Sequence, residues 1–82
     1  MTTAPTTKTT HELREGDIVR SHGMRLLIDQ EIEVYDDTRA TSALILNPEE
    51  VIEIGFVPRR WIERGRWRIQ GNEKARWRID AA

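Results

Sequence analysis

The chain has 82 residues, no cysteine and a formal net charge of -1. This length suits one domain with a small core, and the lack of cysteine excludes a disulfide framework and a thiolate metal site. No basic start followed by an apolar run is present, so the sequence predicts neither a secretory signal nor a membrane span and, by default, a cytoplasmic protein.

The first part of the chain predicts a tail and two strands. Residues 1–11 are rich in threonine and offer almost nothing to bury, so we expect a flexible tail ahead of a single domain over residues 12–82. Residues 18–20 begin the first strand, and residues 24–29 form the return strand after a tight turn at Gly23. A hairpin is therefore expected at the start of the domain.

Two more strands are expected in the middle of the chain. Residues 31–35 alternate in polarity, which predicts a strand with Ile32 and Val34 turned inward. An acidic loop follows, and residues 41–46 are apolar enough to form another strand.

The next segment contains signals for both helix and strand. Asn47 followed by proline and two glutamates is typical of a helix start. The following residues are β-branched, so we expect a turn or one helical turn at 48–50 and a strand over 51–57. Residues 58–64 predict a short helix that ends at Gly65.

The C-terminal residues repeat a two-residue alternation on both sides of a Gly-Asn turn, which predicts a β-hairpin. The apolar side chains of its strands share one face, with Trp67 opposite Ile79 and Ile69 opposite Trp77. The opposite face is cationic and places Arg68 opposite Arg78, which is unfavourable without a counter-ion. Candidate internal counter-ions are Glu31, Glu33, Asp36 and Asp37.

Five or six short antiparallel strands with little helix predict a mainly β fold, a small SH3-like barrel that ends in the hairpin. Residues 13–20 place a Gly-Asp turn before an apolar strand and resemble the opening of SH3-like and KOW-like barrels. KOW-like barrels often bind RNA or ribosomal and transcription proteins, and the resemblance carries that expectation only by analogy of fold.

The segments 47–51, 57–61 and 67–79 are similar to small uncharacterised proteins of actinobacterial phages and their hosts. That resemblance implies a phage or prophage origin. It supplies no catalytic or binding residues that could be transferred to this chain.

Charge is divided unequally along the chain. Residues 1–54 hold five basic and eleven acidic groups, whereas residues 55–82 hold eight basic and three acidic groups. Such a division indicates either attraction between the two halves or an anionic partner. The candidate binding residues are the arginines of the second half and one tryptophan: Arg59, Arg60, Trp61, Arg64, Arg66, Arg68, Arg76 and Arg78.

The simplest interpretation of Trp67 and Trp77 is that they belong to the core, while Trp61 lies among arginines and is a candidate for an exposed anchor. His11 and His22 are isolated, so the sequence predicts no enzyme, no cofactor and no metal site. We therefore expect a protein-interaction module, with a host or phage protein or a second copy as partner. The alternative is a nucleic-acid-binding barrel whose arginines contact phosphates.

Overall fold

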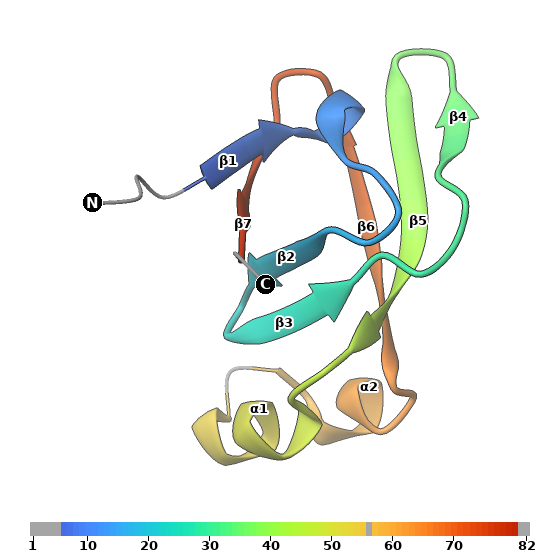
Figure 1. The fold of residues 1–82 in the computed structure, drawn as a ribbon. Helices are drawn as coiled ribbons and strands as arrows, with labels where there is room; N and C mark the ends of the chain where they lie inside the picture. The colour runs from blue at the N-terminus through green and yellow to red at the C-terminus, as the bar shows by residue number, and fades with distance from the viewer. Residues whose placement is uncertain (1–5, 56, 81–82) are drawn as a thin grey trace, which may run out of the picture.

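The computed structural model describes residues 6–55 and 57–80, and within them seven antiparallel strands form one sheet with two short helices at one end (Figure 1). The mainly β fold is therefore confirmed, with more strands than predicted. The strands are β1 (Thr6–Thr9), β2 (Ile18–Ser21), β3 (Met24–Leu27), β4 (Glu33–Tyr35), β5 (Thr38–Ile45), β6 (Arg66–Asn72) and β7 (Arg76–Ile79). A 3-10 turn, η1 (Thr10–Glu12), follows β1, and the helices are α1 (Pro48–Ile54) and α2 (Arg59–Ile62).

The long strand β5 organises the sheet. Its residue Ala40 pairs with Glu33 of β4 and with Gln70 of β6, so β4 and β6 lie on opposite edges of β5. The end of β5 pairs with β3, and the sheet continues through β2 and β7 to β1. Among the described strands β6 pairs with β5 alone, so the sheet is open on that side.

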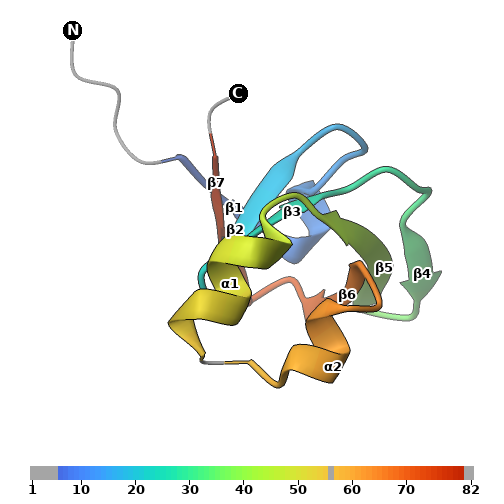
Figure 2. The same ribbon diagram turned by 90° about the horizontal axis from the view of Figure 1, so that it is seen from below.

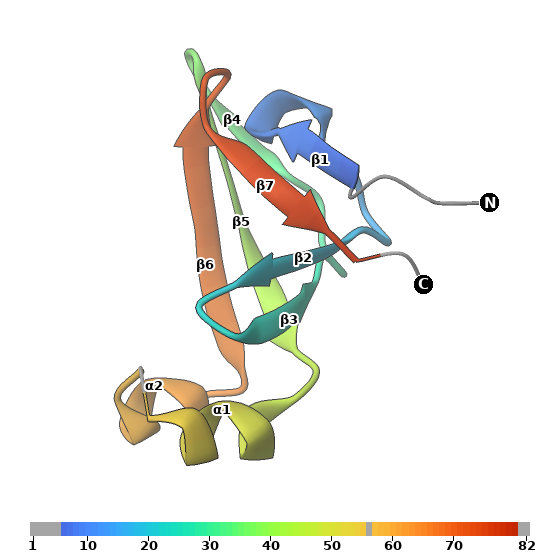
Figure 3. The ribbon, with the colours of Figure 1, turned by 90° about the vertical axis from the view of Figure 1, so that its left-hand side faces the viewer.

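Strands β6 and β7 do not form the predicted hairpin. β6 pairs with β5 from Leu44↔Arg66 to Thr38↔Asn72, a longer ladder than the short β7 could provide, whereas β7 lies between β1 and β2 (Figure 3). The turn η1 lies where the two strands part. There the Thr10 backbone N–H donates to the Ala75 carbonyl at 3.1 Å, and Trp77 Nε1 donates to Thr10 Oγ1 at 2.8 Å.

The strand β1 corrects the predicted start of the domain. Residues 6–11 were expected in a flexible tail, yet Thr6–Thr9 pairs with β7 and the next residues form η1. Threonine is β-branched and favours strands, and Lys8 Nζ fixes β1 through an ion pair to Asp17 Oδ2 at 3.0 Å. Residues 1–5 of the predicted tail lie outside the described residues.

The segment with mixed signals forms one helix over residues 48–54, and residue 56 of the predicted strand lies outside the described residues. The strand predicted over 51–57 is wrong, because α1 continues to Ile54 and ends at Gly55, whose φ of 79° is a left-handed helix cap. Val51 is fully buried by this helix, so tertiary packing overrides the β-branched composition. Helix α2 is the predicted short helix, shorter at both ends than 58–64, and lies beside α1 (Figure 2).

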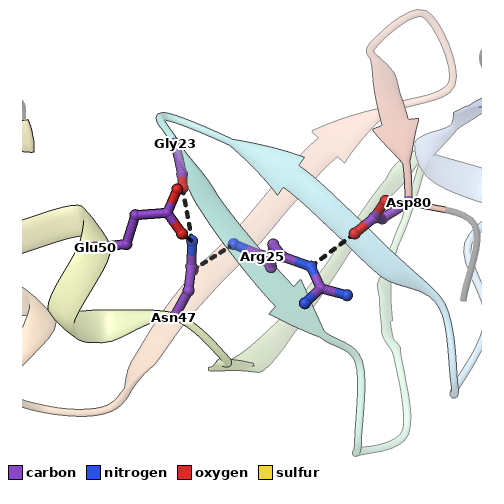
Figure 4. A network of polar contacts seen from close by, with 5 residues as sticks. All are labelled: Gly23, Arg25, Asn47, Glu50 and Asp80. Atoms are coloured by element: carbon purple, nitrogen blue, oxygen red, sulfur yellow. Dashed lines mark hydrogen bonds and ion pairs between the residues drawn. The ribbon is translucent and has the colours of Figure 1, made fainter.

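A polar network joins α1 to the β2–β3 hairpin (Figure 4). The Asn47 side chain accepts the backbone N–H of Arg25 at 2.8 Å and donates to the Gly23 carbonyl and to Glu50 Oε2, each at 3.1 Å. Asn47 therefore acts as a bridge between elements rather than as a helix cap. Beside it, Arg25 Nε forms an ion pair with Asp80 Oδ2 at 2.6 Å, which ties β3 to the residue after β7.

The strands and both helices contribute to one core, with Val51 of α1 buried in it. Alternation along β2 and β3 buries Val19, Met24 and Leu26, and Ile62 of α2 completes the end of the core. The inward position predicted for Val34 is wrong, because this side chain is 63% exposed. In the described part of the chain, no helix is both long and apolar enough to cross a membrane.

Candidate binding site

Two tryptophans meet where α2 leads into β6. Ile62 of α2 turns into the core, which leaves its neighbour Trp61 on the outer side and 40% exposed. Trp67 of β6 is partly buried and packs against the core. The ring centroids of Trp61 and Trp67 are 5.9 Å apart and their planes are inclined by 53°, a separation typical of interacting aromatic pairs.

These rings form one wall of a pocket of about 260 Å³. The structure brings together half of the predicted site residues here, and it adds Trp67, which the sequence interpretation assigned to the core. The residues that line the aromatic–arginine pocket are Trp61, Arg64, Arg66, Trp67 and Arg68.

One arginine of the pocket has an internal partner. Arg66 donates from Nη1 to Asp29 Oδ1 at 2.9 Å and from Nη2 to Asp29 Oδ2 at 2.8 Å. These hydrogen bonds lower the pKa of Asp29 and raise the pKa of Arg66. The four carboxylates predicted as counter-ions form no ion pair within residues 6–55 and 57–80, and Asp29 takes that place for Arg66.

Arg68 and Arg64 have no such partner among the described residues. Arg68 Nε donates to Gln70 Oε1 at 3.0 Å, which leaves its charge uncompensated by a carboxylate at ion-pair distance. The nearby Tyr35 hydroxyl donates to Glu33, an interaction that raises the pKa of Tyr35, and the Arg68 charge opposes this rise. The pocket therefore presents two arginines that can receive an external anion.

The other four predicted site residues lie outside the pocket. Arg59 and Arg60 are exposed on α2, where Arg59 Nε pairs with Glu63 Oε1 at 2.8 Å across one helical turn. An exposed pair of this kind contributes little to stability. Arg76 and Arg78 are on β7, and the expected opposition of Arg68 and Arg78 is wrong.

Arg78 instead lines a second hollow with two side chains that were not predicted as site residues, Arg20 and His22. Arg20 follows buried Val19 in β2, so alternation alone could have placed it on the outer face. His22 was interpreted as an isolated turn residue, but its ring centroid lies 6.0 Å from that of Trp67. Its place near β6 depends on packing between distant segments, for which the sequence carries no local signal.

Within residues 6–55 and 57–80, no group of three or more His, Asp or Glu side chains could hold a metal ion. Ser21 Oγ and His22 Nδ1 share a hydrogen bond at 2.8 Å, and both belong to an exposed turn. The chain matches no protein-family model and shows no significant similarity to a curated protein or to a solved structure.

Proposed function

We propose that this chain is a non-enzymatic binding module that recognises another protein through the aromatic–arginine pocket, and that its curled sheet is a small SH3-like barrel. The observation that carries the proposal is an exposed tryptophan, Trp61, supported by a second ring and surrounded by arginines. Tryptophan and arginine are the residue types that most often dominate binding energy at protein interfaces.

The size of the pocket favours a protein partner over a small molecule. Its volume of about 260 Å³ lies below the range of about 300–1,000 Å³ that small-molecule sites usually have. A space of this size suits one anchoring side chain of a partner. The arginines on its rim favour an acidic neighbour of that anchor, because Arg64 and Arg68 lack ion pairs within the described residues.

The resemblance to small proteins of actinobacterial phages and their hosts extends the proposal to the origin of the partner. A phage or host protein in the host cytoplasm is the partner that this resemblance suggests. A second copy of the chain is the alternative protein partner, and nucleic acid bound through the arginines is the alternative ligand.

Affinity capture from lysate of an actinobacterial host tests the proposal. Wild-type protein is compared with Trp61→Ala, with Arg64→Ala/Arg68→Ala and with Arg59→Ala, a matched control outside the pocket. We expect a protein that is captured by wild type and by Arg59→Ala, is lost with the two pocket variants, and resists nuclease and added salt.

A captured protein that does not depend on Trp61 would refute the pocket as the interface. Capture that disappears after nuclease treatment would instead favour the nucleic-acid alternative. Sedimentation of the purified protein tests the homodimer, since a mass that rises with concentration and returns to that of a monomer in Trp61→Ala indicates self-association through the pocket.

A further inference from the structure

A row of arginines crosses the outer face of the sheet. In the strand register, Arg78 of β7 lies opposite Arg20 of β2, and Arg20 lies opposite Arg25 of β3. Residues directly opposite each other on neighbouring antiparallel strands point to the same face. Val19 and Met24, the sequence neighbours of two of these arginines, are buried on the other face. The arginine row, defined as Arg78, Arg20 and Arg25, therefore faces solvent.

Like charges opposite one another destabilise a sheet unless an anion compensates them. Within the row only Arg25 has a carboxylate partner, Asp80, at 2.6 Å (Figure 4). Arg20 and Arg78 are exposed and form no ion pair with any residue of the described segments. These two adjacent guanidinium groups therefore form a favourable site for an external anion.

A hollow lies beside these two arginines. Arg20 and Arg78 line it with the turn Ser21-His22-Gly23, and its volume is about 350 Å³. The turn is tight, since His22 and Gly23 have φ values of 53° and 80°. The Ser21 hydroxyl and the exposed imidazole of His22 add polar groups to one wall. The hollow thus combines two guanidinium groups, a hydroxyl and an exposed aromatic ring.

We propose that the arginine row and this hollow bind the phosphate backbone of single-stranded nucleic acid. Arg20 and Arg78 would contact phosphate oxygens, for which the planar guanidinium group is suited, and the exposed His22 ring would stack on a base. Recognition of this kind depends on charge and carries little sequence information. The hollow shares no lining residue with the aromatic–arginine pocket, although the His22 ring lies 6.0 Å from the Trp67 ring of that pocket, and the proposal does not rest on a protein partner at Trp61.

Fluorescence anisotropy with a labelled oligothymidine tests the proposal. The variant Arg20→Gln/Arg78→Gln is compared with Arg14→Gln/Arg59→Gln, which removes the same charge from exposed positions outside the row. We expect the row variant to lose at least about tenfold in affinity and the control to stay within about twofold. Because each phosphate contact to a single strand contributes about 0.7 to the salt slope, the row variant should reduce the slope by about 1.4.

Three results would overturn the proposal: no binding by wild type at low salt, equal losses in both variants, or a duplex of the same length bound as tightly as the single strand. Trp61→Ala removes no residue that lines this hollow, so it should weaken oligothymidine binding far less than Arg20→Gln/Arg78→Gln. The row variant should melt at or above the wild-type temperature, because it removes a repulsion.

A second measurement needs no variant. At constant ionic strength, oligothymidine should raise the melting temperature of the wild-type protein, because a ligand that binds only the folded state stabilises it. The absence of a shift would overturn the proposal. An equal shift with inorganic phosphate would also overturn it, since the site would then recognise an isolated phosphate rather than a nucleic-acid strand.

Discussion

Removal of one hydroxyl group tests how η1 joins the two C-terminal strands. Thr10 is buried, its Oγ1 accepts Trp77 Nε1 at 2.8 Å, and the same oxygen lies 3.5 Å from the Ala75 carbonyl. Thr10→Val preserves the shape but leaves the indole N–H without its partner. A buried donor without a partner costs about 1–3 kcal/mol. Trp77 is only partly buried, so we expect a loss of about 1–2 kcal/mol.

Thermal unfolding followed by circular dichroism measures this loss, and in a domain of this size each kcal/mol lowers the Tm by about 4–8 °C. Thr10→Ser retains the hydroxyl group and serves as the control. A double-mutant cycle with Trp77→Phe isolates the bond, since Thr10→Val should cost at least about 0.5 kcal/mol less in the Trp77→Phe background. Equal costs in both backgrounds would refute the role assigned to this hydrogen bond.

Three further predictions concern stability. Gly71→Ala should destabilise by about 1–3 kcal/mol, because its Cβ would lie 2.8 Å from the bonded Thr10 hydroxyl; unchanged urea unfolding would contradict this. Asn47→Ala should cost about 1–2 kcal/mol, because the Arg25 N–H loses its acceptor, and Asn47→Asp should cost at least as much, because a second carboxylate oxygen would replace the amide donor facing the Gly23 carbonyl and Glu50. The pKa of Asp29 is lowered in the folded state by its arginine partner, so its contribution to stability is complete above about pH 5 and disappears as pH falls through the lowered pKa; the Tm difference between wild type and Asp29→Asn should therefore narrow in acid, and a constant difference would contradict the assignment.

Local alternation was sufficient to predict several elements of the fold. The inward residues of β2 and β3, the outward arginines of β6 and the short helix α2 each follow from a pattern within a few residues. Period-two alternation determines which face a side chain takes, whatever strand lies next to it. The sequence therefore predicted the faces of β6 correctly, whereas it placed Val34 of β4 on the wrong face.

Strand partners could not be predicted in the same way. A Gly-Asn turn between two alternating segments favours a hairpin, but β6 gains a longer ladder from β5, and Thr10 fills the space between β6 and β7. Both facts depend on segments far away in the sequence. Helix α1 illustrates the same limit, because the burial of Val51 is a tertiary effect that outweighs its strand propensity.

The two candidate sites also differ in how far the local sequence reveals them. The pocket residues Trp61, Arg64 and Arg68 are close in sequence, so composition alone drew attention to them. The arginine row is built from three strands, and the sequence interpretation did not select its members Arg20 and Arg25 as candidate binding residues. Local composition reveals the first kind of site, and only topology reveals the second.

The charge division along the chain acquires a physical meaning from the ion pairs. Attraction between the two halves accounts for Arg66, which binds Asp29 of the first half. The ion pair Arg25–Asp80 has the opposite effect on the charge of the basic half. It neutralises Asp80, one of the three acidic residues of that half, with an arginine of the acidic half. Internal pairing in the described residues thus removes little of the cationic excess of residues 55–82. That excess remains at the surface, at the aromatic–arginine pocket and along the arginine row, and both proposals place an anionic group against it. Salt should weaken the phosphate contacts of the row more steeply than an interface anchored by Trp61.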